Sequence, residues 1–188
     1  MSYIDKTLTF NSDKIYFYNS DLEIEQQVMM DWEDSLMSAS AVYVCQNEGD
    51  ILEIGFGMGI SAGYIQSASI SSHTIIENHQ DIIPKALEWA LDKPNVTIVT
   101  GSWYDNLDIL STYDGVFYDT YGDEHNKYFS SSLSQLVKEG GVATWWNSLS
   151  TPSNFFNIPD VKYQLIAINP PPNNYFNNNY YYLPKKQF

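Results

Sequence analysis

Short apolar runs alternate with amphipathic segments along most of the chain, and their spacing predicts the order of strands and helices. Strands are expected at 51–54, 73–77, 96–99, 114–119 and 142–146, and helices at 58–66, 82–91 and 124–138. The last helix should end at Gly140-Gly141, because glycine readily adopts the left-handed geometry of a helix C-terminus. Two late runs, 163–168 and 180–183, are separated by a flexible Pro- and Asn-rich loop instead of a helix, which predicts an antiparallel hairpin.

The N-terminal part follows a different pattern. Residues 1–20 are expected to form an irregular arm. Ser20-Asp21-Leu22-Glu23 matches a capping box, and apolar residues at 24, 28, 32 and 36 predict a helix over 21–45 that contributes to the active site. Residues 50–188 form the alternating core. Such alternation implies an α/β fold with a single domain over 1–188: a doubly wound, Rossmann-like sheet, mostly parallel with a C-terminal antiparallel hairpin.

The composition restricts the possible partners. The 188 residues carry a formal net charge of −14, with nine lysines and no arginine. DNA, RNA and anionic membranes normally require a cationic patch, so they are not expected as partners. The charge is compatible with a small cationic substrate, and equally with an acidic surface that only aids solubility. With one cysteine, Cys45, and no visible signal peptide or membrane span, we expect a cytoplasmic monomer or homodimer.

A glycine-rich turn follows the first core strand, at the carboxyl end where α/β sheets bind ligands. Its residues are Gly55, Phe56, Gly57, Met58 and Gly59. A dinucleotide-binding turn requires glycine at position 60, which is Ile60 here. The spacing therefore disfavours a dehydrogenase and is similar to the turn of methyltransferases.

Two further positions are candidates for binding a nucleoside. Glu77 ends the second core strand, where a carboxylate can accept hydrogen bonds from both ribose hydroxyls, or can simply be favoured by the dipole of the next helix. Ser102 and Trp103 follow the third strand. An aromatic ring there can cover an adenine or pack against the core.

Two acids are candidates for the reacting site. Glu33 has only apolar residues three and four positions away, so its carboxylate either needs a distant partner or reaches solvent at the edge of the helix. Asp119 ends the fourth core strand, beside the expected ligand crevice. Alternatively, it caps the following helix.

The order of these motifs resembles that of the class I methyltransferases. Residues 53–59, Glu77, 114–119 and 138–141 carry this resemblance. Within the class, the chain resembles the guanidinoacetate N-methyltransferases, over nearly everything from Leu22 onward. The matching stretches are 28–33, 52–58, 75–78, 118–121 and 181–184.

The resemblance implies a methyl donor, S-adenosyl-L-methionine, which leaves as S-adenosyl-L-homocysteine, and no metal. It adds Asn78, Met29, Met37 and Asp119 to the donor pocket formed by the glycine turn and Glu77. It implies that Glu33 and Asp119 bind the guanidino group, and that the backbone of Leu149 and Ser150 binds a substrate carboxylate.

Two acids would suit a guanidinium, whose pKa of about 12.5 or more keeps its nitrogens protonated and without a free lone pair. We expect Asp119 to orient the group and accept its proton, with Glu33 as a second clamp, although either acid is able to serve as the base. The arm is shorter than in the family, and a short connection at 152–159 replaces a helical stretch. Both departures should reshape the acceptor pocket.

Three functions stay open on this basis. The first is N-methylation of a small guanidino compound such as guanidinoacetate. The second is methylation of another amine or of protein arginine, and the third is a catalytically silent donor-binding module. His73, His79 and His125 lack metal-ligand spacing and are interpreted as surface or loop residues.

Overall fold

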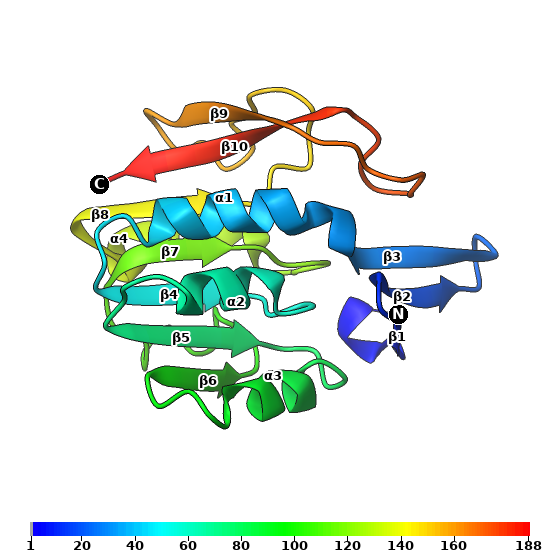
Figure 1. Cartoon of the computed structure of the whole chain (residues 1–188), viewed down its shortest axis with the longest axis horizontal. Helices are drawn as coiled ribbons and strands as arrows, with labels where there is room; N and C mark the ends of the chain where they lie inside the picture. Colours follow the sequence, from blue (N-terminus) through cyan, green and yellow to red (C-terminus); the bar gives the residue numbers. More distant parts are fainter. Residues whose placement is uncertain (1) are drawn as a thin grey trace.

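A seven-stranded sheet runs through the computed structural model, which describes residues 2–188 (Figure 1). The strand order is β6-β5-β4-β7-β8-β10-β9 and reverses between β4 and β7. The strands are β4 (Asp50–Ile54), β5 (Ser72–Glu77), β6 (Val96–Thr100), β7 (Tyr113–Tyr118), β8 (Val137–Trp145), β9 (Lys162–Ala167) and β10 (Tyr180–Gln187). Strands β4 to β8 pair in parallel, and β10 is antiparallel to β8 and β9. The predicted mostly parallel α/β sheet with its C-terminal hairpin is confirmed.

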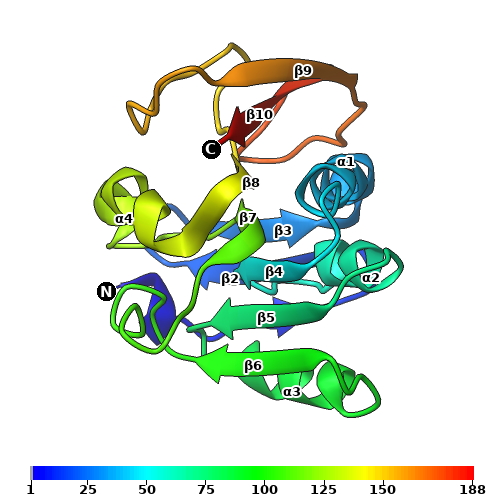
Figure 2. The same ribbon diagram turned by 90° about the vertical axis from the view of Figure 1, so that its left-hand side faces the viewer.

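Helices cover both faces of this sheet (Figure 2). One face carries α1 (Asp34–Val44), α2 (Ile60–Gln66) and α3 (Ile83–Ala90), and the other carries α4 (Phe129–Leu136). Under α4, the buried ring of Phe129 stacks on Tyr118 of β7 with 4.1 Å between ring centroids. Among residues 2–188, no helix has both the length and the apolarity needed to cross a membrane.

A second, small sheet lies beyond the carboxyl ends of the parallel strands (Figure 1). It consists of β1 (Thr9–Phe10), β2 (Lys14–Asn19) and β3 (Ile24–Met30), all antiparallel, and a 3-10 turn, η1 (Tyr3–Asp5), precedes it. In β2, Ile15 and Phe17 are buried, with more exposed residues between them. The expectation of an irregular arm over 1–20 is therefore wrong for most of the arm, because this alternation lets β2 bury one face.

The predicted helix over 21–45 is wrong in its first half. Residues 24–30 form strand β3, a 3-10 turn η2 (Asp31–Glu33) follows, and α1 begins only at Asp34. The capping box does not form, and Glu23 has a positive φ of 54°. A spacing of four places residues on one face of a helix and also on one face of a strand, so the repeat does not distinguish them. Pairing with β2 decides in favour of the strand.

The predicted helix over 124–138 is shorter than expected. A 3-10 turn, η3 (Asn126–Tyr128), leads into α4, which ends at Leu136, and Val137 already pairs with Tyr113 in the sheet. Gly140 and Gly141 do not end the helix; they lie inside β8 and exchange backbone hydrogen bonds with Phe188. Gly140 has a φ of 80°, so its flexibility serves an irregularity in the strand.

Candidate active site

One cavity of about 250 Å³ lies at the carboxyl ends of β4, β5 and β7, where the strand order reverses. This is the position at which open α/β sheets bind ligands. Of the predicted site residues, those that line it are Met29, Glu33, Gly55, Phe56, Gly57, Glu77, Asn78, Trp103 and Asp119. The others do not: Met37, Met58, Gly59, Ser102, Leu149 and Ser150.

The glycine turn forms the floor of the cavity with bare backbone. Gly55 has a φ of 99°, and a Cβ there would lie 1.9 Å from the carbonyl oxygen of Asp119. At Gly57, with φ 55°, a Cβ would lie 2.5 Å from the sulfur of Met29. That sulfur accepts the N–H of Met58 at 3.2 Å. A side chain at position 55 would clash with the main chain, and one at position 57 would have to displace the Met29 side chain. The bare backbone at both positions lets the chain approach a ligand closely here.

Glu77 joins the end of β5 to this turn. Its Oε2 accepts the N–H of Phe56 at 2.9 Å, and its Oε1 accepts the N–H groups of Asn78 and His79, each at 2.8 Å. A carboxylate offers about four acceptor positions, so one remains for a ligand hydroxyl. The buried carboxylate is therefore fixed in place and still able to bind.

Trp103 lines the cavity from the loop after β6. Its Nε1–H donates to Oδ2 of Asp123 at 2.6 Å, and the Tyr118 hydroxyl donates to the same oxygen at 2.5 Å. Ser102 points elsewhere, within 3.0 Å of His125 Nδ1. Asp123, which also lines the cavity, was not among the predicted residues.

Glu33 lies in η2, not in a helix, and only 3% of it is exposed. This burial is inconsistent with the alternative that it reaches solvent. Oε1 accepts the Met30 N–H at 2.9 Å and the Tyr175 hydroxyl at 2.6 Å. Burial, and then the charge of Asp119, raise the pKa of Glu33 to about 8, although both hydrogen bonds oppose the shift.

Asp119 follows β7 directly and is half-buried at the cavity wall. The next helical residues begin at Asn126, so it caps no helix. Burial raises the pKa of Asp119 to about 7, and the charge of Glu53 contributes to the shift. Glu53 itself is fully buried and hydrogen-bonded to Ser61 and to His73. Glu33 and Asp119, whose pKa values are both raised, therefore share this wall of the cavity.

The interpretation of the histidines as surface or loop residues is wrong for His73, which lies in β5; His79 does lie in the loop after β5, although it is buried. His73 is fully buried in β5, with Nε2 2.9 Å from Glu53 Oε2, and His79 is fully buried beside the ring of Tyr3. Burial of His73 is tolerated because the carboxylate of Glu53 satisfies it. Within residues 2–188, no group of three or more His, Cys, Asp or Glu residues is arranged to hold a metal ion.

Leu149 and Ser150, whose backbone was expected to bind a substrate carboxylate, do not line the cavity. Leu149 is 50% exposed, and its N–H already donates to Oδ1 of Asn147 at 3.2 Å. Ser148, one residue earlier, lines the cavity in its place.

Met37, which was expected in the donor pocket, is instead buried in the core among side chains of α1 and the sheet.

Aromatic residues complete the wall, and sequence reasoning did not place them there. They are Tyr3, Tyr121, Trp146 and Tyr175. They come from η1, from the loops after β7 and β8, and from the loop between β9 and β10. Nothing in their local sequence marks them, because each reaches the cavity only through the tertiary fold.

Comparison with known families supports the resemblance. A sequence model described as guanidinoacetate N-methyltransferase matches residues 8–171. Protein arginine N-methyltransferase 2 of Yarrowia lipolytica is 33% identical over 190 residues, covering 90% of this chain and 39% of that protein. The protein of the same name from Aspergillus fumigatus is 34% identical over 158 residues, covering 78% of this chain and 36% of its own length. The chain thus spans less than two fifths of these relatives.

Solved structures share the fold at low sequence identity. Spermidine synthase from Thermotoga maritima superposes with a TM-score of 0.63 at 14% identity, covering 96% of this chain and 72% of its own. A putative methyltransferase from Escherichia coli gives a TM-score of 0.60 at 10% identity, with 88% and 92% coverage. These likenesses concern the sheet and its order.

Proposed function

The chain belongs to the guanidinoacetate N-methyltransferase family, and from this premise we propose that it transfers a methyl group from S-adenosyl-L-methionine to a guanidino nitrogen. The observation that carries the proposal is the pair of acids, buried Glu33 and half-buried Asp119, on one wall of the cavity. No salt bridge within residues 2–188 involves either acid. Buried carboxylates without a cation call for a cationic ligand.

The donor side of the cavity fits the proposed cofactor. The bare backbone at Gly55 and Gly57 leaves space that a Cβ would fill, and Glu77 keeps an acceptor position for a ribose hydroxyl. We assign Phe56, Asn78 and Trp103 to the same side, since they line the cavity. When bound, the donor supplies an electrophilic methyl group on a positively charged sulfur.

The acceptor side would use both acids. A guanidinium presents N–H donors in a planar fork, and a carboxylate accepts two of them in parallel. Asp119 is partly open to the cavity, while Glu33 has both of its protein hydrogen bonds on Oε1 and keeps Oε2 for the ligand. The two negative charges balance the two positive charges of sulfonium and guanidinium. Holding the nitrogen in line with the methyl group is then mainly a matter of positioning.

One proton must leave the guanidinium as the methyl group arrives. A carboxylate whose burial disfavours the charged form is a stronger base than one in water, so a raised pKa suits this role. Asp119 has the more open carboxyl group, and we assign it the proton. Glu33, held by two donors, is assigned the clamp.

Protein arginine is the second candidate acceptor, because the relatives from Yarrowia and Aspergillus are named protein arginine N-methyltransferases. The guanidino chemistry is the same for both acceptors. A small acceptor is favoured by the enclosure of the acids: Glu33 is 3% exposed, beneath Tyr175. Because this chain covers less than two fifths of these relatives, methylation of protein arginine by this chain is a proposal only.

A transfer assay with labelled donor tests the proposal. Acceptors are guanidinoacetate, arginine, other small guanidines, simple amines and an arginine-containing peptide. We expect label on a small guanidine, and Asp119→Asn should lower kcat by roughly 10²- to 10⁴-fold because the base is lost. Asp108→Asn changes an exposed acid outside the cavity wall; it is the matched control and should retain activity. Donor binding without transfer to any guanidine would refute the assignment.

A further inference from the structure

Tyr175 contacts Glu33, the proposed clamp for the acceptor, although the two residues lie far apart in the chain. It lies in the loop 168–179 between β9 and β10, 142 positions away from Glu33 in the chain, and its hydroxyl donates to Glu33 Oε1 at 2.6 Å. The Met30 N–H donates to the same oxygen at 2.9 Å. Two donors on one oxygen restrain the carboxylate and leave Oε2 without a protein hydrogen bond in a residue that lines the cavity.

The ring of Tyr175 is held by two tryptophans. It stacks on Trp32 with a centroid separation of 5.9 Å and an interplanar angle of 29°, and it lies 6.2 Å from the ring of Trp146. Burial, together with the charge of Glu33, raises the pKa of the Tyr175 hydroxyl above its usual value. The hydroxyl therefore stays protonated and acts as a donor throughout the neutral range.

Two asparagines directly before Tyr175 anchor the loop. Asn173 Oδ1 accepts the N–H groups of Tyr175 at 3.0 Å and Phe176 at 2.7 Å, which forms a tight turn. Asn174 bonds to β3: its Nδ2 donates to the Glu25 carbonyl at 2.9 Å, and its N–H donates to Gln27 Oε1 at 3.1 Å. The run that reads as a flexible loop in the sequence is thus tied to the strand that leads into Glu33.

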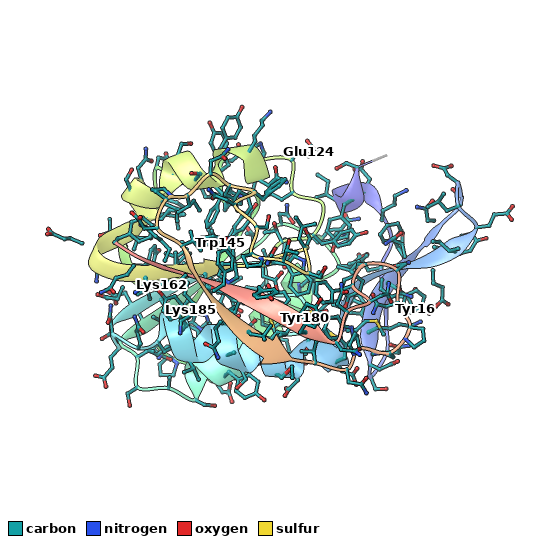
Figure 3. All side chains as sticks on the ribbon, turned by 90° about the horizontal axis from the view of Figure 1, so that it is seen from above. Tyr16, Glu124, Trp145, Lys162, Tyr180 and Lys185 are labelled. Carbon is teal, nitrogen blue, oxygen red and sulfur yellow. The ribbon has the colours of Figure 1, made fainter. Side chains whose placement is uncertain are left out.

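The β9–β10 hairpin places this loop near β3, as two views show. In Figure 3, Lys162 and Lys185 lie together at one end of the hairpin, and Tyr180 lies toward the end where Tyr16 of β2 is found. Figure 1 shows the same loop end reaching over β3. The hairpin therefore extends from the sheet edge to the cavity.

We propose that Tyr175 is a positioning residue for the methyl acceptor, because its hydroxyl sets the orientation of the Glu33 carboxylate. The inference rests on the proposed function and deepens it. The titratable groups that face Glu33 are Asp119 at the end of β7, Tyr175 itself, and Tyr181 on β10, whose hydroxyl accepts the Asn147 N–H at 2.6 Å. Of these, only Tyr175 donates a hydrogen bond to it.

Kinetics of Tyr175→Phe test the inference, since this change removes the hydroxyl and keeps the stacked ring. We expect kcat/KM for the acceptor at neutral pH to fall about tenfold, and the acid limb of the pH profile to move up by about one pH unit, because the ionised carboxylate loses a donor. The affinity for the methyl donor should not change. Tyr64→Phe is the matched control, because it removes a hydroxyl that donates to the exposed acid Asp34.

Asn174→Ala provides a second, independent variant. It keeps the Tyr175 hydroxyl but removes the three side-chain hydrogen bonds of Asn174 to β3, so it should produce a smaller change in the same direction. A Tyr175→Phe enzyme with an unchanged pH profile and acceptor KM would overturn the inference. So would an equal loss of donor affinity, which would indicate a general structural role.

A carboxyl-carbon NMR titration separates this inference from the proposed function. The Glu33 signal is assigned with Glu33→Gln and followed against pH in the free protein. We expect its apparent pKa to rise by about one unit in Tyr175→Phe and to stay unchanged in Tyr64→Phe. If no guanidine is methylated by the unmodified protein, the proposed function fails while this contact stands. An unchanged titration in Tyr175→Phe refutes the contact whatever the enzyme methylates.

Discussion

At the scale of residues, the cavity keeps two acids where their charged forms are unfavourable. Burial and the negative charge of Asp119 both act against ionisation of Glu33, and only two hydrogen bonds oppose them. A neighbouring cation usually stabilises such a buried carboxylate, and none of the salt bridges among the described residues provides one for Glu33 or Asp119. The folded state therefore carries an electrostatic cost that a guanidinium would relieve.

This cost gives a prediction for stability. The pKa of Glu33 is about 8 in the folded protein, against about 4.3 in an unfolded chain. Between these values the folded state binds more protons than the unfolded state, so its stability falls as pH rises from about 4 to about 8. Glu33→Gln lacks this loss. Without ligand, it should be more stable than the unmodified protein by up to about 5 kcal/mol at pH 8.5, at about 1.36 kcal/mol per pKa unit, with little difference at pH 4.

Urea unfolding at the two pH values provides the measurement. Glu139→Gln, which changes an exposed acid, is the control and should show no such pH-dependent gain. Glu33→Gln being less stable than the unmodified protein at pH 8.5 would show that the carboxylate is not strained where it lies.

At the scale of elements, the turn after β4 brings the two halves of the site together. The Asp119 N–H donates to the Ile54 carbonyl at 2.9 Å, and the Gly55 N–H donates to the Ile76 carbonyl at 2.8 Å. These bonds extend the parallel pairing of β4 by one residue on each side. Asp119 is thereby placed beside the glycine turn by main-chain geometry, and among the described residues its side chain makes no hydrogen bond or salt bridge.

The turn should tolerate no side chain at its first glycine. In Gly55→Ala, the new Cβ would meet the Asp119 carbonyl at 1.9 Å in a backbone conformation with φ 99°. We expect a loss of about 3 kcal/mol or more in unfolding free energy and a loss of donor binding. Gly63→Ala, in α2 with no atom within 4 Å of a Cβ, should instead be neutral or stabilising by up to about 1 kcal/mol. Equal stability of the two variants, measured by urea unfolding, would contradict this account of the turn.

The same elements show what the sequence could predict. The central strands are short apolar runs bounded by turns, and all of them were found within a few residues. The segment 24–30 was misassigned because a spacing of four fits a strand as well as a helix, and only pairing with β2 distinguishes them. Gly55, Glu77 and Asp119 were identifiable because each follows a strand. Tyr175 was not, since an Asn-rich run carries no signal of a contact 142 positions away.

At the scale of the whole molecule, the cavity collects segments from both ends of the chain. η1 supplies Tyr3, η2 supplies Glu33, and the loop before the last strand supplies Tyr175. The small sheet β1–β3 and the hairpin β9–β10 meet through Asn174, beyond the carboxyl ends of the parallel strands. The proposed acceptor side therefore combines Asp119, at the end of the parallel strand β7, with parts of the fold outside the parallel sheet.

Proton release on ligand binding tests the central claim, that Glu33 and Asp119 together hold a guanidinium, most directly. Their pKa values are about 8 and about 7, so both are largely protonated at pH 6, and a cation between them would drive their protons off. Calorimetric titration with guanidinoacetate, with S-adenosyl-L-homocysteine present and in buffers of different ionisation enthalpy, counts these protons. We expect release of more than one proton at pH 6 and almost none at pH 9. N-carbamoylglycine, which has the same shape and carboxylate but a neutral ureido group in place of the guanidinium, should bind more weakly and release none. Tight guanidine binding with no proton release at pH 6, or equal binding of the ureido analogue, would contradict the account.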